Sequence, residues 1–292
     1  MGRMISQGGT IVAATDFSEQ AGNALARAAR LAAFHGVALD VLHVMSAASL
    51  DAVRGWLEPG TAERLVEDVR MELARIAQDA EVPASHRLVV GEAFADIAAA
   101  CKSGALLAIG ARGLNPLRDA ILGTTAERLV GRYEGPVLVV RKPPSASYRK
   151  VVVGLDLLSG SQAVLESAIR LAPDAAVAAA HAYDVPFDGA LQRAGVAQDT
   201  IERYRKEAQS RATSGILALG LAVAGDAQRV RPVTDRTHPA RLVVECARSV
   251  EADLIVVGKR RHSALEALVV GSVTRHVLAD AEADVLVVPL PG

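Results

Sequence analysis

Glycines and threonines gather in one stretch, GARGLNPLRDAILGTT (110–125), at a spacing that suits an anion-binding loop. The residues concerned are Gly110, Gly113, Gly123, Thr124 and Thr125. A helix N-terminus presents unpaired N–H groups and a partial positive charge, which together attract phosphate. Neighbouring glycines allow sharp turns and a close approach of the backbone, threonines add hydroxyl donors, and Arg112 could supply charge to a terminal phosphate. Taken singly each glycine is better explained as a turn or cap residue, but the combination predicts a phosphate site.

Alternating strands and helices must position this stretch. Apolar runs predict strands near 9–15, 37–44, 85–90, 105–109 and 136–140, and helices near 18–35, 60–80, 93–102 and 123–133. The strand runs are continuously apolar, which is typical of a parallel sheet covered on both faces. Such a doubly wound α/β sheet binds ligands beyond the C-terminal ends of its strands. Gly110 ends the fourth strand and Gly123 opens the fourth helix, so both lie at that edge.

The chain is two copies of this unit. The segment 9–32 resembles 149–172, and 123–141 resembles 271–289, so the period of about 145 residues indicates a duplicated domain rather than a solenoid. We expect a first domain at 1–142, a linker at 143–148 that starts with Pro143 and Pro144, and a second domain at 149–292. Each domain should contain a five-stranded parallel sheet flanked by helices.

Composition limits the class of protein. The 292 residues carry a formal charge of −1, which argues against a nucleic-acid surface. No apolar run approaches the roughly 18 residues that a membrane helix needs, and the N-terminus lacks the pattern of a signal peptide. The two cysteines, Cys101 and Cys246, are far apart and suit buried thiols in a reducing compartment. We therefore expect a cytoplasmic protein without a membrane segment.

The pattern G-x2-G-x9-G-T after a buried strand resembles the ATP-binding signature of the universal stress protein family. The sequences ATDFS (14–18), LHV (42–44) and GPVLVV (135–140) strengthen the resemblance, which covers essentially the whole chain twice. It implies adenine-nucleotide binding and a regulatory role in stress. It also implies that the tandem copies resemble a dimer fused in one chain, an intramolecular pseudo-dimer. There the strands 136–141 and 284–289 would pair, and further homodimerisation stays open.

The same resemblance implies a set of nucleotide-binding residues. Ala14, Thr15 and Asp16 would line the adenosine, and the Val41 backbone would contact adenine. Ribose and phosphates would be surrounded by the residues of the glycine stretch, Gly110, Arg112, Gly113, Gly123, Thr124 and Thr125. The ligand would be ATP, ADP or AMP, with or without Mg²⁺. Asp16 is equally explained as a turn or cap residue, and His43 and His181 are better explained as polar strand-end residues than as ligands.

The second copy departs from the pattern. In GKRRHSALEALVVGS (258–272), Gly258, Gly271 and Ser272 fit the signature, and Asp156 corresponds to Asp16. Arg261 replaces the middle glycine, so strain or a blocked pocket is expected if that position needs positive φ or touches the ligand. The basic loop could instead fold over phosphates or simply be solvated. These second-site residues are therefore weaker candidates than those of the first copy.

No catalytic constellation emerges from the sequence. The P-loop, the nucleophile elbow and the zinc helix motifs are absent. We expect an ATP-binding regulatory protein of the stress response, with nucleotide held mainly by the first domain. Two alternatives stay open: an interaction module that binds no nucleotide, and a slow ATPase or adenylating enzyme.

Overall fold

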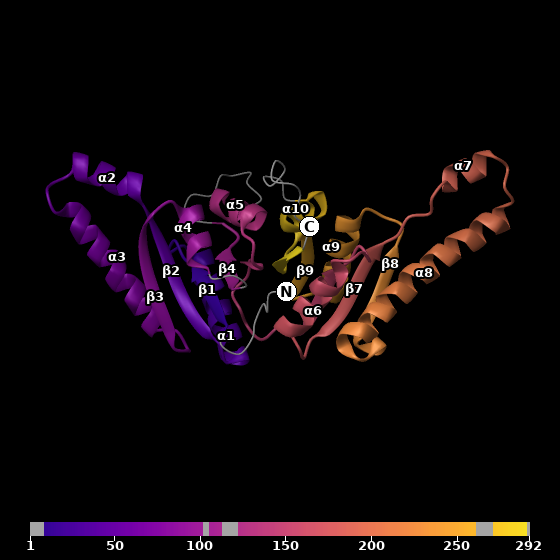
Figure 1. Cartoon of the computed structure of the whole chain (residues 1–292), viewed down its shortest axis with the longest axis horizontal. Helices are drawn as coiled ribbons and strands as arrows, with labels where there is room; N and C mark the ends of the chain where they lie inside the picture. The colour runs from indigo at the N-terminus through magenta and orange to yellow at the C-terminus, as the bar shows by residue number, and fades with distance from the viewer. Residues whose placement is uncertain (1–8, 102–104, 113–121, 261–270, 291–292) are drawn as a thin grey trace. The chain divides into compact units, whose positions relative to one another are not determined.

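The computed structural model describes residues 9–101, 105–112, 122–260 and 271–290 (Figure 1). Two compact units emerge from the contacts between residues. The first contains the described residues up to Ser147 together with Asp284–Pro289. The second contains Tyr148–Arg260, Gly271–Ala283 and Leu290. The last strand of the second repeat is therefore counted largely with the first unit.

The first unit is a doubly wound α/β domain. Its strands are β1 (Thr10–Ala14), β2 (Ala38–Ser46), β3 (Ala84–Gly91), β4 (Leu106–Gly110), β5 (Val137–Val140) and β10 (Asp284–Leu290). Its helices are α1 (Glu19–His35), α2 (Ala47–Trp56), α3 (Thr61–Gln78), α4 (Ala93–Ala100) and α5 (Thr124–Arg132). The strand order β3-β2-β1-β4-β5-β10 places the first five strands in parallel, as predicted. The sequence did not predict α2.

Helices cover both faces of this sheet. Helix α1 packs against β1, β4 and β5, while α4 and α5 pack against each other. Right-handed crossovers place α1 on one face and α4 and α5 on the other. Ser18 caps the start of α1 by accepting from Ala21 N, and Gly36 ends it with φ of 61°, a left-handed conformation that glycine adopts without strain.

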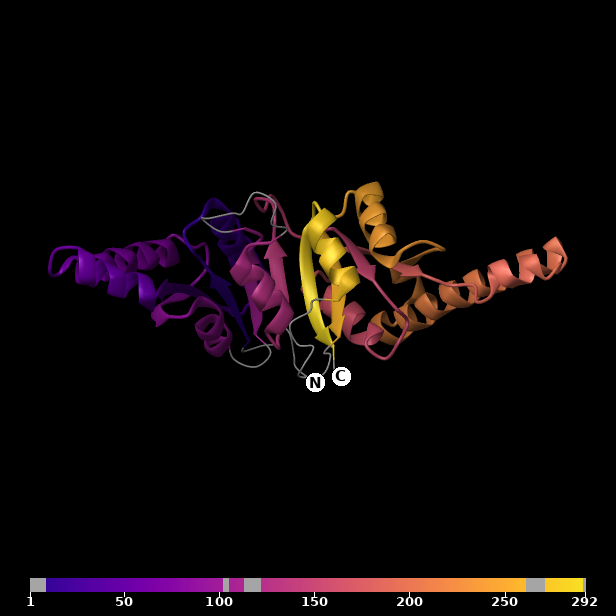
Figure 2. The ribbon, with the colours of Figure 1, turned by 90° about the horizontal axis from the view of Figure 1, so that it is seen from above.

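Strand β10 pairs antiparallel with β5 (Figure 2). The register joins Val285 to Val139 and Val287 to Val137. Every residue of β5 is buried, because strands on both sides and helices above and below exclude water from it. The predicted pairing of 136–141 with 284–289 is thereby confirmed.

The second unit repeats the architecture. Its strands are β6 (Lys150–Gly154), β7 (Ala176–Ala182), β8 (Val230–Asp235) and β9 (Leu254–Arg260), all parallel in the order β9-β6-β7-β8. Its helices are α6 (Ser161–Leu171), α7 (Asp188–Arg193), α8 (Gln198–Ala224), α9 (Pro239–Val250) and α10 (Ser272–Asp280). Helix α6 packs against α8, and α9 packs against α10, so each pair covers one face.

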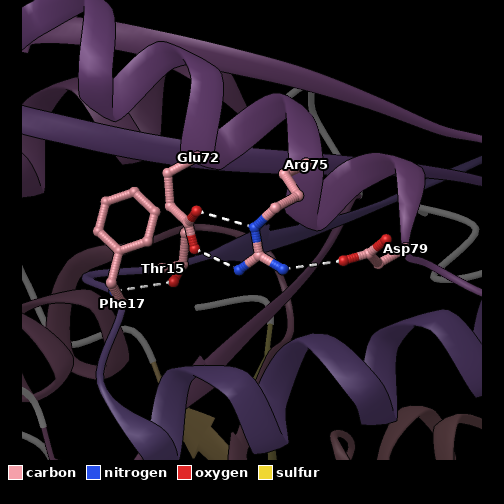
Figure 3. A network of polar contacts seen from close by, with 5 residues as sticks. All are labelled: Thr15, Phe17, Glu72, Arg75 and Asp79. Atoms are coloured by element: carbon pink, nitrogen blue, oxygen red, sulfur yellow. Dashed lines mark hydrogen bonds and ion pairs between the residues drawn. The ribbon is translucent and has the colours of Figure 1, made fainter.

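Ion pairs stabilise the exposed side of α3. Arg75 donates to both carboxylate oxygens of Glu72, at 2.9 and 2.6 Å, and to Asp79 at 3.1 Å (Figure 3). Spacings of three and four residues bring these side chains together on the helix surface. The hydrogen bond from Arg75 lowers the pKa of Glu72, but the exposure of the group keeps the contribution to stability small.

A second arginine cluster ties α7 to α8 and to the chain after β8. Asp188 accepts two hydrogen bonds from Arg205, both at 2.8 Å, and one from Arg236 at 3.1 Å. The hydrogen bond from Arg205, followed by that from Arg236, lowers the pKa of Asp188 to about 2. Because this folded-state pKa lies below the value of about 3.9 expected in the unfolded chain, the cluster stabilises the fold fully above about pH 4 and loses that effect toward pH 2.

We therefore expect Asp188→Asn to lower the melting temperature at pH 7. The difference from the parent protein should shrink as the pH falls from 4 to 2, because the parent carboxylate is then protonated as well. Melting curves recorded across this range by circular dichroism measure the effect. Arg205→Gln, which removes the main partner, should reduce the same pH dependence. A difference that stays constant from pH 7 to pH 2 would contradict the assignment.

Candidate functional site

A cavity of about 510 Å³ opens at the carboxyl edge of the first unit's sheet. Its lining comes from the ends of β1, β2 and β4 and from the starts of α1, α4 and α5. Eight of the residues that the sequence predicted as nucleotide ligands line it: Ala14, Thr15, Asp16, Gly110, Arg112, Gly123, Thr124 and Thr125. Segments up to about 110 residues apart in the chain are thus brought to one place, the edge at which doubly wound sheets bind ligands.

The turn after β1 forms one side of this cavity. Thr15 Oγ1 accepts a hydrogen bond from Phe17 N at 3.0 Å, and Asp16 Oδ1 accepts one from Ser18 N at 3.1 Å. Ser18 Oγ in turn accepts from Ala21 N at the start of α1. Asp16 therefore stabilises the turn, which is one of the two roles that the sequence analysis considered for it. Asp16 also lines the cavity.

The N-terminus of α5 forms the opposite side. Gly123 is the N-cap residue, and no side chain of the described residues makes a capping hydrogen bond to this helix. The helices α1 and α4, by contrast, are capped by Ser18 and by Glu92. Because the first N–H groups of a helix have no partner within the helix, those of α5 that no described residue caps could bind an anion in the cavity.

Strand β4 ends at Gly110, and both Gly110 and the nearby Arg112 line the cavity. A Cβ atom on Gly110 would lie 2.8 Å from the carbonyl carbon of Gln20, so the structure requires glycine there for packing against α1. The sequence analysis placed Gly110 beside ribose or phosphate, and Gly110 also lines the cavity. Arg112 donates its backbone N–H to Gln20 Oε1 at 2.8 Å, and its side chain is exposed.

Two predicted residues are not brought to the described cavity. Val41 is fully buried within β2, between β1 and β3, and Val44 and Ser46 at the end of the same strand line the cavity in its place. Gly113 lies outside the described residues, as does Arg261 of the second copy. The sequence analysis also missed an apolar part of the lining, made by Ala93, Ile97, Ile109, Ala126 and Leu129. These residues carry no chemical signal of their own, and only the fold brings them together.

The corresponding edge of the second unit is arranged differently. Asp156 accepts hydrogen bonds from Leu158 N and Ser161 Oγ, both at 2.9 Å, and forms an ion pair with Arg260. The hydrogen bonds to Leu158, Ser161 and Arg260 lower the pKa of Asp156 against the opposing effect of burial. The carboxylate that would face a nucleotide is therefore engaged by the chain itself.

Leu290 occupies space beside two glycines of the second unit. A Cβ atom on Gly160 would lie 2.5 Å from Leu290 Cδ1, and one on Gly258 would lie 2.7 Å from the same atom. Leu290 is only 5% exposed. Gly258 therefore makes room for a leucine of its own unit. Gly271, the N-cap residue of α10, meets no atom within 4 Å of a Cβ position, and Ser272 begins that helix.

The two cysteines are buried. Burial raises the pKa of Cys101 to about 11 and also raises that of Cys246, so both thiols stay protonated at neutral pH. Within the described ranges, no three His, Cys, Asp or Glu side chains gather as metal ligands. Among the same residues, no helix combines the length and the apolar character needed to cross a bilayer.

The fold and the cavity define a doubly wound α/β protein with a ligand site at the carboxyl edge of a parallel sheet. The Universal stress protein family matches residues 9–141 and again residues 147–289. The chain belongs to this family of stress-response proteins, and it contains two tandem copies of the family's domain.

Proteins named as universal stress proteins align with nearly the whole chain. A universal stress protein of Mycolicibacterium smegmatis is 27% identical, over 95% of this chain and 96% of the relative. One from Mycobacterium tuberculosis is 26% identical, over 96% of this chain and 95% of the relative. The crystal structure of a universal stress protein from Archaeoglobus fulgidus superimposes with a TM-score of 0.67 at 17% identity, over 97% and 99% of the two chains. The tandem arrangement is thus shared along essentially the whole chain.

Proposed function

We propose that the first unit binds an adenine nucleotide in its cavity and that the bound nucleotide regulates a cytoplasmic stress response. One observation carries this proposal: the N-terminus of α5, without a capping side chain among the described residues, opens into a cavity of about 510 Å³. That volume lies within the range of typical small-molecule pockets. The helix start would receive the phosphates, because its N–H groups and its dipole both favour an anion.

The remaining lining suits the rest of a nucleotide. Val44, Ile97 and Leu129 offer apolar surface on which a base can lie, while Thr15, Asp16 and Ser46 offer polar atoms for the sugar. Thr124 and Thr125 would add hydroxyl donors beside the phosphates. Family membership points to adenine as the base. ATP is the form we propose, with Mg²⁺ carried mainly on its phosphate oxygens.

The second unit is proposed to contribute little to nucleotide binding. Leu290 fills the space beside Gly160 and Gly258, and Arg260 pairs with the carboxylate of Asp156. A nucleotide that approached Asp156 would have to displace its ion pair with Arg260. We therefore expect one nucleotide per chain.

Thermal denaturation with and without ATP tests the proposal. At a free ATP concentration of 100 Kd, a ligand that binds only the folded state stabilises it by about 2.7 kcal/mol. We expect a rise in melting temperature with ATP, and adenine nucleotide in the supernatant when protein purified without added nucleotide is denatured. Titration calorimetry should give a stoichiometry near one. A protein that releases no nucleotide and shows no shift at millimolar ATP would contradict the proposal and favour an interaction module.

A further inference from the structure

His43 is hydrogen-bonded to the turn that forms one side of the cavity. Its Nδ1 atom is 2.7 Å from the carbonyl oxygen of Thr15. A carbonyl oxygen only accepts hydrogen bonds, so Nδ1 carries the proton and donates it. The N–H of Thr15 donates to the carbonyl oxygen of Leu42 at 2.9 Å. The N–H and the carbonyl group of Thr15 are thus hydrogen-bonded to Leu42 and His43, two consecutive residues of β2.

The turn itself has an unfavourable backbone conformation. Phe17 has φ of 63°, in the left-handed region that residues with a Cβ atom seldom adopt. Its N–H donates to Thr15 Oγ1, as Figure 3 shows. Its ring lies against the ring of His43, with centroids 4.6 Å apart and an angle of 46° between the planes. His43 therefore contacts the strained turn through both a hydrogen bond and a ring contact.

The second unit contains the same arrangement. His181 Nδ1 is 2.9 Å from the carbonyl oxygen of Leu155, and Leu155 N donates to Ala180 O at 2.9 Å. Leu157, in the position of Phe17, also has a left-handed φ, of 57°. The hydrogen bond from the histidine thus accompanies the left-handed turn in both repeats, although the second lacks the aromatic ring at this position.

We infer that His43 is a positioning residue of the nucleotide site: its Nδ1–H holds the Thr15 carbonyl, and with it the Thr15–Asp16 side of the cavity, in the conformation that receives the nucleoside. The inference rests on the proposed function, because it requires nucleotide in this cavity. Without the hydrogen bond, the strain at Phe17 would be released by a rotation of the turn. Thr15 and Asp16 would then leave their places in the lining.

Two amide variants separate the hydrogen bond from the bulk of the ring. The side-chain nitrogen of asparagine can take the place of Nδ1 and donate to Thr15 O, whereas glutamine places its amide near Nε2. We expect His43→Gln to weaken ATP binding about tenfold, which corresponds to the loss of one hydrogen bond. His43→Asn should stay within about threefold of the parent. His181→Gln is the matched control, because it removes the same contact in the second unit and should leave ATP affinity unchanged.

Titration calorimetry with ATP on the three variants and the parent tests the positioning role of His43. Parental affinity in folded His43→Gln overturns the positioning role and leaves the proposed function intact; so does an equal loss in the glutamine and asparagine variants. Absence of ATP binding in the parent overturns the proposed function itself, and this inference with it.

Should His43→Gln fail to fold, the same substitution is made together with Phe17→Gly, which removes the backbone strain. The double variant should then fold and bind ATP within about threefold of Phe17→Gly alone, and a tenfold gap between the two would contradict our account of the strain.

Discussion

Replacing Gly123 by valine should abolish detectable ATP binding while the protein stays folded. Gly123 has φ of −62° and ψ of 150°, a conformation that valine adopts readily, so the substitution introduces no backbone strain. Its branched side chain would stand at the helix start where we propose that the phosphates bind. We expect a loss of affinity of at least about 100-fold, or roughly 2.7 kcal/mol. Titration calorimetry measures the loss, and circular dichroism checks the fold.

Gly271→Val provides the matched control. Gly271 is the N-cap residue of α10, with φ of −51° and ψ of 147°, and a Cβ atom there meets nothing within 4 Å. ATP affinity should not change, because we place no nucleotide in the second unit. Parental affinity in folded Gly123→Val would show that the phosphates bind elsewhere. A comparable loss in Gly271→Val would show that the second unit takes part.

The sequence predicted the parallel sheet of the first unit because its strands are continuously apolar. The runs at 105–109 and 136–140 became β4 and β5 within one or two residues. Helix α2 was not predicted, although Leu50, Val53 and Trp56 recur at helical spacing; the helix is short, and only Leu50 is buried. The pairing of β10 with β5 was accessible only through the family resemblance, since a buried run does not identify the strand beside it.

The polar and glycine residues of the candidate cavity were predicted from the sequence, except for Ser46. Asp16, Gly123 and Thr124 carry a chemical pattern, whereas Ile97 and Leu129 look like any core residue and gain meaning only from the fold. The role of Gly110 could not be read from the sequence either. Packing against the backbone of Gln20 and contact with a phosphate both demand a residue without Cβ, and the coordinates show that the packing applies.

The two copies use the first glycine of the signature for different packing contacts. Gly258 matches Gly110 in the signature, yet its missing Cβ accommodates Leu290. The alignment of VLVVRK (137–142) with VLVVPL (285–290) places Lys142 of the first copy at the position of Leu290. A signature glycine alone therefore does not establish contact with a ligand.

A buried ion pair provides the second large effect, this time on stability. Arg27 of α1 is 7% exposed, and its Nε lies 3.3 Å from Oδ2 of Asp284, which is 3% exposed. Its Nη1 donates to the carbonyl oxygen of Ala146 at 2.7 Å, and Arg141 N donates to Asp284 Oδ1 at 2.8 Å. This cluster joins α1, the segment after β5 and the start of β10 within the first unit.

We expect Arg27→Met to lower the free energy of unfolding by about 3 kcal/mol, because methionine fills similar space but leaves the Asp284 carboxylate buried without this cation. Urea denaturation measures the loss. Arg30→Met is the control: Arg30 lies in the same helix, is exposed, and donates a long hydrogen bond of 3.4 Å to Ser145 O, so its change should stay within about 0.5 kcal/mol.

Adding Asp284→Asn to Arg27→Met tests whether the buried charge of Asp284 causes the loss of stability. Asparagine is neutral and keeps an oxygen for the hydrogen bond from Arg141 N, so the double variant should recover more than half of the lost stability. Burying a single charge costs several kcal/mol, whereas burying a hydrogen-bonded amide costs far less. A double variant that is as unstable as Arg27→Met would mean that the lost packing and the lost bond to Ala146, rather than the loss of the Arg27 cation beside Asp284, cause the destabilisation.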